Sequence, residues 1–204
     1  NRVRELIPGR TSGQLQHSLD YIPGRHNVRN VVLDLSKTYK SFAKEFFPNA
    51  KIIADKFHVL RLLNPALTKY RKQITGDKRK NPIRKLLLKS AINLDYDTRR
   101  TVEKWLKDHP ELEAIYYAKE ALHKLYRCRG RKKAKRCLVK LMDGLSVSKV
   151  KELQTLRKTL MEWKNEILNY FERRITNAKT EGYNNVCKEL QKGASDLAAF
   201  LTTD

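Results

Sequence analysis

The sequence predicts an α/β protein with mostly helix, in which an α/β core is interrupted by an all-helical region. Two observations support this class. Over residues 1–64, short apolar runs that suit buried strands alternate with amphipathic helical patterns. Over residues 65–165, apolar side chains recur at helical spacing, and no convincing strand is present. We therefore expect strands only near residues 2–7, 29–34 and 50–54.

The first 64 residues predict strand, helix, strand, helix, strand and helix, in that order. RVRELI alternates as a strand does, and TSGQLQHSLDYI suits a short helix; each is followed by Pro-Gly-Arg. NVVLDL and KIIAD are compact apolar runs that suit buried strands. SKTYKSFAKEFF places Phe42 and Phe46 on one helical stripe, with Ser36 as a plausible N-cap. KFHVLRLLNPALTKYRKQI predicts one long helix over residues 56–74.

The rest of the chain is dominated by helical stripes. Breaks are expected at LKDHPEL and MDGLSVSK, and the last long helix should continue through ILNYFERR. A further break at ITNAKTEG precedes a helix at YNNVCKEL. The residues of the two main stripes are Leu112, Ile115, Tyr116, Leu122, Leu125 and Tyr126, then Val150, Leu153, Leu160, Trp163, Ile167 and Phe171.

Charge is the most unusual feature of the composition. The 204 residues include 44 Lys and Arg against 22 Asp and Glu, which gives a formal net charge of +22. This excess indicates a polyanionic partner, with nucleic acid as the first candidate. An anionic membrane surface is the weaker alternative, because no apolar run approaches the ~20 residues of a membrane span. The opening NRVRELIPGR is not typical of a signal peptide.

The three cysteines do not indicate a particular metal site or disulfide pattern. Cys128, Cys137 and Cys187 are odd in number and fit neither a zinc pattern nor a disulfide framework. Free thiols in a reducing cytoplasm are the expected interpretation.

Basic residues are concentrated in two runs. Residues 69–85 carry eight basic side chains against one acid, Asp77, and residues 126–136 carry seven basic side chains and no acid. Either run alone suits a solvated helix face or mobile loop equally well. Two such runs in one helical region favour contacts to phosphate. The candidate DNA-binding residues are Arg71, Lys72, Lys78, Arg79, Lys80, Arg129, Arg131, Lys132, Lys133, Lys135, Arg136 and, further along, Lys188.

Three carboxylates have positions that suit either chemistry or structure. Asp34 ends the Val31–Leu33 run, where α/β sheets open toward ligands, but it also suits an N-cap or turn before the next helix. Asp55 ends KIIAD with His58 one turn on, and a helix cap or structural Asp–His pair is the favoured interpretation. Glu181 lies at the expected start of a helix, where the helix dipole favours an anion.

Several ordered motifs resemble the ISL-three family of insertion-sequence transposases, which belong to the DDE type. The stretch VVLDLSKTYKSFAKEFFPNAKIIADKFHVLRLLNPAL is similar to the central signature of that family. It contains Asp34, Tyr39, the Pro-Asn-Ala at residues 48–50 and the Asp-Lys-Phe-His-Val at residues 55–59. The resemblance continues through LRKTLMEWKNEILNYFERRITNAKTEGYNNVCKEL. It covers nearly the whole chain.

The resemblance implies an RNase-H-like core that uses Mg²⁺, or Mn²⁺, to cleave and transfer DNA strands. Asp34 matches the second catalytic acid and Glu181 the third, with Asp55 as an alternative metal ligand and with His58 and Asn184 in support. Residues 1–64 and 166–204 would form the core, and residues 65–165 a helical insertion between the two acids. DNA, as transposon ends and target, is the implied partner.

The resemblance also sets expectations for the intact protein. The family's first Asp lies on a strand that would precede Asn1, so the chain corresponds to a C-terminal portion of an incomplete core. A bacterial cytoplasm, at the nucleoid, and a homo-oligomer are implied. The alternative is a relative that binds nucleic acid without catalysis. The residues that depart from the family pattern include Ala178 and the run from Gln191 to Asp196.

Overall fold

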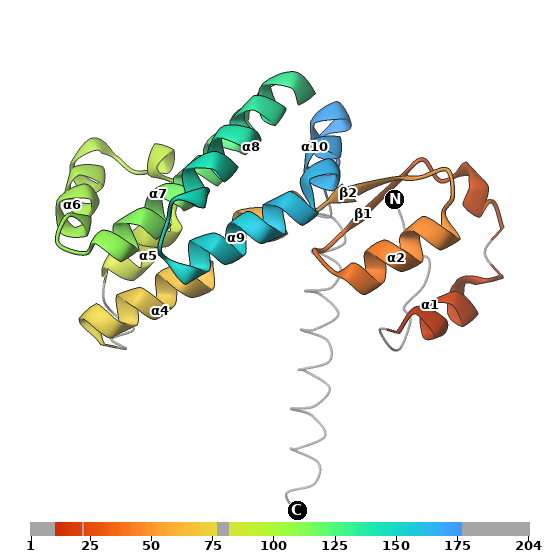
Figure 1. Cartoon of the computed structure of the whole chain (residues 1–204), viewed down its shortest axis with the longest axis horizontal. Helices are drawn as coiled ribbons and strands as arrows, with labels where there is room; N and C mark the ends of the chain where they lie inside the picture. Colours follow the sequence, from red (N-terminus) through yellow and green to blue (C-terminus); the bar gives the residue numbers. More distant parts are fainter. Residues whose placement is uncertain (1–10, 22, 77–81, 177–204) are drawn as a thin grey trace, which may run out of the picture. The chain divides into compact units, whose positions relative to one another are not determined.

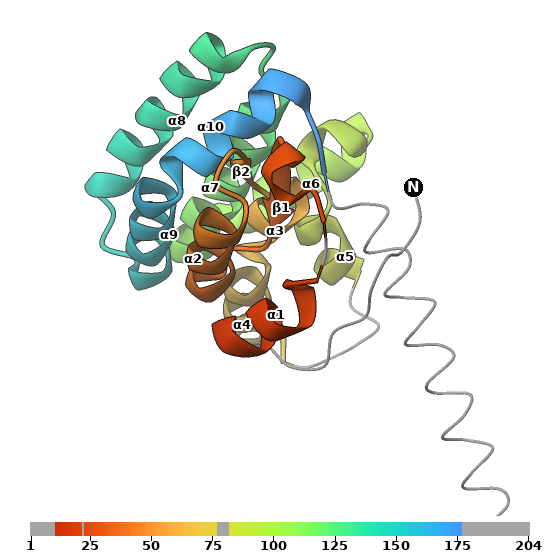
Figure 2. The ribbon, with the colours of Figure 1, turned by 90° about the vertical axis from the view of Figure 1, so that its right-hand side faces the viewer.

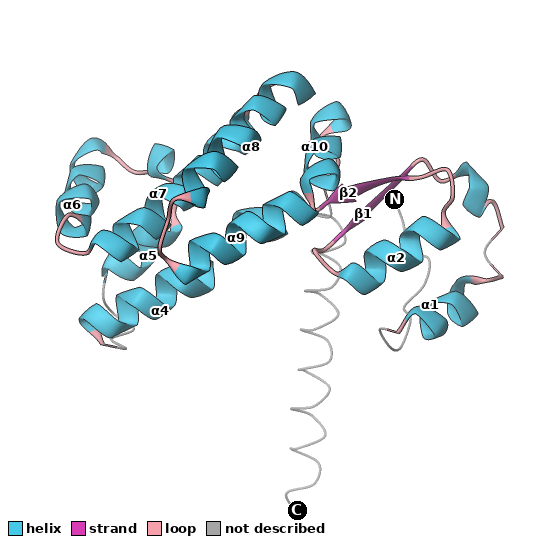
Figure 3. Cartoon of the chain, viewed as in Figure 1, coloured by secondary structure: helices cyan, strands magenta, loops and turns pink. Residues whose placement is uncertain are grey.

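Helices account for most of the structure, a computed structural model that describes residues 11–21, 23–76 and 82–176. Strands β1 (Asn30–Leu33) and β2 (Lys51–Ala54) form a two-stranded parallel sheet. Figure 3 shows these strands in magenta among the helices, and the described residues contain no other strand. The predicted class, α/β with mostly helix, is therefore confirmed. The strand expected near residues 2–7 and the helix expected at YNNVCKEL lie outside the described residues.

The chain divides into two compact units. One comprises residues 1–52 and 175–204, and the other comprises residues 53–174. We call them the discontinuous unit and the helical unit. The predicted domain boundaries, with an RNase-H-like core at residues 1–64 and 166–204, stay a prediction.

The discontinuous unit is organised around β1 and α2 (Lys37–Phe46). Ser36 begins α2 as predicted, because its Oγ accepts a hydrogen bond from the Tyr39 amide at 3.4 Å. Phe42 and Phe46 are buried and stack at 5.1 Å between ring centroids. Helix α1 (Ser12–Leu19), which begins with a capping box at Thr11, packs against α2 (Figure 2). A short 3-10 helix, η1 (Arg25–Asn27), precedes β1.

The helical unit packs around a central helix. Helix α7 contacts α3, α4, α6, α8 and α9, and Figure 1 labels α4, α6, α8 and α9 beside it. The described residues of this unit beyond β2 form helices and turns without a strand. Its elements are α3 (Lys56–Leu60), α4 (Asn64–Thr75), α5 (Pro82–Leu88), η2 (Ala91–Asn93), α6 (Tyr96–Leu106), α7 (Pro110–Arg127), α8 (Arg131–Ser146), α9 (Lys151–Glu162) and α10 (Lys164–Arg173).

The core of the helical unit follows the predicted stripes. All six apolar residues predicted on the α7 stripe are buried, among them Ile115 and Leu122, which are fully inaccessible. Burial of side chains of this size is worth about 1.5–3 kcal/mol each. The second stripe is also buried from Leu153 to Phe171, although Val150 at its start is only half-buried and precedes α9. Periodicity therefore predicted this core almost completely.

Two helices that the sequence predicted as continuous are broken. The helix expected over residues 56–74 is α3 followed by α4, because α3 ends at Leu60 and Pro65 lies in the first turn of α4. Proline suits that turn because its missing N–H has no intrahelical acceptor there. The helix expected to run through ILNYFERR is α9 followed by α10. They meet at the buried Trp163, whose backbone leaves helical geometry at φ −103° and ψ 13°.

A buried cation joins α7 to the end of α5. The Lys119 side chain is fully buried, and its Nζ donates to the carbonyl oxygens of Leu87 at 2.8 Å and Lys89 at 2.5 Å. It also forms a 2.8 Å ion pair with Glu120. Burial lowers the pKa of Lys119, against the opposing effect of Glu120. These contacts satisfy a charge that would otherwise be costly in the core.

Candidate nucleic-acid interface and carboxylate positions

Asp34 directly follows β1, as the sequence predicted. Its side chain is half-buried, and its carbonyl oxygen accepts a hydrogen bond from the Ser36 amide at 2.7 Å. Ser36, rather than Asp34, caps α2. Asp34 is therefore not the N-cap, but its backbone hydrogen bond with Ser36 is that of a turn, which was the other structural interpretation of this residue. Its role as a metal ligand stays a prediction.

Asp55 stabilises the start of α3. Its Oδ2 accepts a hydrogen bond from the His58 amide at 3.3 Å and lies 3.0 Å from His58 Nδ1. Asp55 is 1% exposed and is the N-cap of α3. Both structural interpretations of the Asp–His spacing, a cap and a pair, are thus present together.

The third carboxylate and its neighbours lie outside the described residues. This applies to Glu181, Asn184 and Lys188, so their proximity to Asp34 stays a prediction. Within the residues that the structure describes, no group of three or more His, Cys, Asp or Glu side chains could hold a metal ion.

The first basic run holds fewer surface cations than its sequence indicates. Arg71 is only 2% exposed, and its Nη1 donates to the Gly76 carbonyl at 3.0 Å and to Thr75 Oγ1 at 3.4 Å. The prediction that Arg71 contacts DNA is therefore wrong, because the guanidinium secures the last turn of its own helix. Lys72 is exposed in α4. Residues 78–80, which include Lys78, Arg79 and Lys80, lie outside the described residues.

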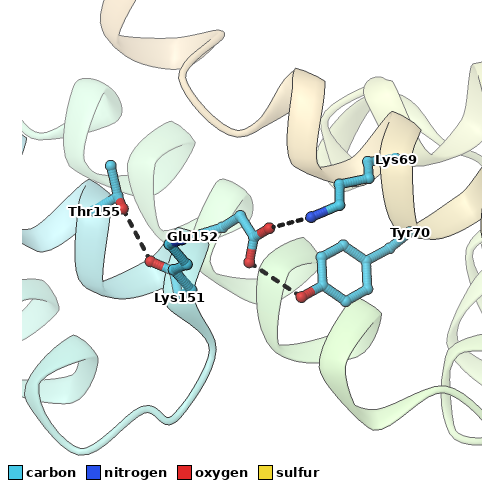
Figure 4. Close-up of polar contacts among 5 residues, drawn as sticks. All are labelled: Lys69, Tyr70, Lys151, Glu152 and Thr155. Carbon is cyan, nitrogen blue, oxygen red and sulfur yellow. Dashed lines mark hydrogen bonds and ion pairs between the residues drawn. The ribbon is translucent and has the colours of Figure 1, made fainter.

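Near the middle of α4, a small network links that helix to α9 (Figure 4). The Glu152 carboxylate accepts hydrogen bonds from Lys69 Nζ and from the Tyr70 hydroxyl, each at 3.0 Å. The Lys69 hydrogen bond lowers the pKa of Glu152, and burial followed by Glu152 raises the pKa of Tyr70. Lys69, a member of the first basic run, is therefore partly neutralised within the fold.

The second basic run forms the clearest cationic surface. It spans the end of α7, the turn at residues 128–130 and the first turns of α8. Gly130 adopts a φ of +79°, which lets the chain reverse into α8. We call its exposed cations the basic patch: Arg127, Arg129, Lys132, Lys133, Lys135 and Arg136.

The basic patch is electrostatically unfavourable on its own. Helix α8 has no acidic residue in its first turn and no side-chain cap, although an uncompensated positive partial charge lies at a helix N-terminus. Lys132 and Arg136 are spaced i,i+4, and such like-charge pairs destabilise a helix by roughly 0.2–0.5 kcal/mol. Among the described residues, no patch member forms an ion pair. A polyanion would relieve this repulsion.

Arg131 differs from its neighbours in the run because its guanidinium is paired with residues of α10. Its Nη1 donates to Asn169 Oδ1 at 2.7 Å and to Glu172 Oε1 at 2.8 Å, so it joins α8 to α10. The sequence grouped Arg131 with the DNA-binding residues because its position in the run gives no information about packing. The structure assigns it to holding the patch in place.

Two features of this turn were not predicted. The Sγ atoms of Cys128 and Cys137 lie 3.0 Å apart, and Arg174 Nη2 donates to the Cys128 carbonyl at 2.6 Å. Arg174 is the only described residue other than glycine with a positive φ. A nine-residue cysteine spacing matches no motif, and a contact between residues 128 and 174 has no local sequence pattern.

The comparisons with known proteins agree with the motifs. The family model for the ISL-three transposases of the DDE type, described as "Transposase", matches residues 1–196. No curated protein and no solved structure shows significant similarity to the chain. Within the described residues, no helix combines the length and the apolar character needed to cross a membrane.

Proposed function

Because the chain belongs to the ISL-three family of DDE transposases, we propose that it contributes to metal-dependent cleavage and transfer of DNA strands. The observation that supports this most strongly is the family match over residues 1–196, which includes the segments of Asp34 and Glu181. Transposon ends and target DNA are the proposed substrates, in a bacterial nucleoid and with a homo-oligomer as the working form.

Asp34 and Glu181 are the proposed metal ligands in an RNase-H-like core. Asp34 is supported by its position directly after a strand of a parallel sheet, where ligands of such sheets bind. Two bound Mg²⁺ or Mn²⁺ ions would activate the attacking oxygen and stabilise the leaving oxygen. The proposal leaves Asp55 out as a ligand, because its Oδ2 already serves α3 and His58.

The basic patch is the proposed DNA-binding surface of the helical unit. Its six exposed cations gather on one turn and one helix start, and the Arg131 contacts to α10 fix that turn. Cations that contact phosphates release condensed counterions, which gives affinity with little sequence preference. The patch thus positions DNA, and the carboxylates would perform the chemistry.

A salt titration tests the basic patch. We compare the chain with a Lys132→Ala/Lys133→Ala/Arg136→Ala variant, in which alanine favours the helix. If all three side chains contact phosphate, the slope of log K against log salt for duplex DNA becomes shallower by about 2.7, at about 0.9 per contact. Affinity should fall equally for unrelated DNA sequences.

The matched control removes the same charge elsewhere. An Arg100→Ala/Lys104→Ala/Lys107→Ala variant removes three exposed cations from α6 and its C-cap, where Asp97 and Asp108 lie nearby in sequence. Its salt slope should stay close to that of the original chain. Equal loss in both variants would show a response to net charge alone and would remove the patch assignment.

Catalysis is tested separately in the intact transposase. Glu181→Gln and Asp34→Asn keep side-chain size and remove the charge that Mg²⁺ coordination needs. Each should abolish Mg²⁺-dependent nicking while leaving DNA binding unchanged. Nicking that survives both substitutions would overturn the assignment of the acids, and a protein that binds without nicking would match a non-catalytic relative.

A further inference from the structure

We propose that Cys128 and Cys137 form a dithiol site that reacts with anionic low-molecular-weight disulfides and closes to an intramolecular disulfide bond. Both residues are free thiols, and their Sγ atoms lie 3.0 Å apart. They come from different elements, since Cys128 ends α7 and Cys137 lies within α8. The fold, rather than the spacing in sequence, creates the pair.

The geometry permits a bond with little rearrangement. A disulfide requires a sulfur separation of about 2.05 Å, so the two atoms must approach by about 1 Å. Cys128 has non-helical backbone angles of φ −59° and ψ 138°. It is followed after one residue by Gly130, which is also outside helical geometry. The turn can therefore supply the movement while Cys137 keeps its helical position.

The two thiols differ in access, which sets the order of the reaction. Cys137 is half-buried, whereas Cys128 is only 5% exposed. Burial, followed by the interaction with Cys137, raises the pKa of Cys128, while Lys133 and Lys124 oppose that rise. Cys137 is thus the thiol that an external disulfide reaches, and Cys128 is the thiol that resolves the product.

The surrounding charge selects the reagent. Six cationic side chains lie between the two cysteines: Arg129, Arg131, Lys132, Lys133, Lys135 and Arg136. Five of these are members of the basic patch, and they give the region a positive potential at partly exposed Cys137. Positive potential concentrates anions near the surface. An anionic disulfide such as oxidised glutathione therefore meets the site at a raised local concentration.

The disulfide bond forms through two successive thiol–disulfide exchanges. Cys137 loses its proton to solvent, and its sulfur then attacks one sulfur of the small disulfide; this forms a mixed disulfide and releases a small thiolate, which takes a proton from solvent. Cys128 then gives its proton to water and attacks Cys137 Sγ, which releases the second small thiol. The protein loses two thiol hydrogens, and the reagent gains them as two thiols. No further oxidant is required.

Mass spectrometry of the folded chain tests the site. We treat the Cys187→Ser variant with oxidised glutathione, which leaves only the proposed pair. The expected product is lighter than the reduced chain by two hydrogens, about 2 Da, with one peptide link between residues 128 and 137. The Cys137→Ser/Cys187→Ser variant is the control, and its buried Cys128 should stay unmodified. A lasting glutathione adduct on Cys137, or no reaction, would overturn the proposal.

A second experiment tests whether the site prefers an anionic disulfide. At low salt, oxidised glutathione should close the pair on the order of tenfold faster than cystamine, which is cationic, and high salt should remove the difference. Lys133→Glu should slow the anionic reagent and accelerate the cationic one. Equal rates for both reagents at low salt would overturn the anionic preference. These readouts do not involve DNA, so they stand or fail independently of the proposed transposase function.

Discussion

The carboxylate of Asp55 is joined to His58 through both the amide and the imidazole of that residue. Oδ2 lies 3.3 Å from the His58 amide nitrogen and 3.0 Å from Nδ1. Asp55 is almost completely buried, whereas the His58 side chain is 45% exposed. The buried Asp55 carboxylate therefore stabilises the start of α3, while the His58 imidazole stays at the surface.

This arrangement predicts that Asp55 contributes to stability. Asp55→Ala should lower the free energy of unfolding by about 1–2 kcal/mol, because the cap is lost and the His58 amide loses its partner. Asp55→Asn retains an oxygen acceptor and should cost less. Urea titration measures both. If Asp55→Asn instead abolished Mg²⁺-dependent nicking in a protein of unchanged stability, Asp55 would be a metal ligand.

Substitution of Arg71 tests whether this arginine stabilises the end of α4 and does not contact DNA. Arg71→Met should destabilise the fold by more than 1 kcal/mol, because Gly76 and Thr75 lose a buried charged donor. The salt slope of DNA binding should stay unchanged. Lys72→Met, one residue on and exposed, is the matched control and should leave stability within about 0.5 kcal/mol. A weaker salt slope for Arg71→Met would restore its role in DNA binding.

The Glu152 network predicts a pH-dependent coupling. A double-mutant cycle of Lys69→Met and Glu152→Gln should give a coupling energy of roughly 0.5 kcal/mol at neutral pH. The folded-state pKa of Glu152 is lowered, chiefly by the Lys69 hydrogen bond, so this stabilisation is complete above the unfolded value near 4.3. It should disappear as pH falls through the lower folded value. A coupling that persisted at pH 2 would contradict an ionic origin.

Substitution of Lys119 should change the free energy of unfolding more than the Glu152 coupling does. Lys119→Met should lower the free energy of unfolding by about 3 kcal/mol or more, because Glu120 loses its ion pair and the Leu87 and Lys89 carbonyls lose a charged donor. Burial lowers the pKa of Lys119, so the folded chain releases this proton at a lower pH than the unfolded chain. The Lys119 contribution should therefore rise with pH up to the unfolded value near 10.4.

Two measurements check this prediction. Chemical denaturation between pH 7 and pH 10 should show a stability slope in the original chain that Lys119→Met reduces. Lys124→Met, at an exposed position of the same helix, should change neither the free energy of unfolding nor its dependence on pH. A neutral effect of Lys119→Met would mean that a well-packed apolar side chain replaces the buried charge fully.

Local patterns predicted the elements whose formation depends on local physics. The β1 and β2 runs, the Ser36 cap and the buried stripe of α7 follow from apolar spacing and capping chemistry. The break at Pro65 was also encoded locally, but the strong apolar pattern on both sides favoured one helix. Trp163 shows the opposite case, because nothing in its local sequence ends a helix.

Charge patterns did not show which basic side chains the fold itself uses. A basic run shows how many cations are present, but it does not show which of them pair with other parts of the fold. Arg71 is buried and bonded to its own helix end, and Arg131 is bonded to Asn169 and Glu172, which are distant in sequence. The candidate acids were identified by family motif, since position after a strand alone did not separate a metal ligand from a cap.

The hydrogen bond from Arg174 to the Cys128 carbonyl joins the end of α10 to the turn at residues 128–130, next to the basic patch. Arg174 ends α10 in left-handed backbone geometry at φ 54°, an arrangement with a small conformational cost that the contact offsets. A displacement of the turn at residues 128–130 when phosphate binds would therefore move the end of α10 with it, because the two are joined through this hydrogen bond.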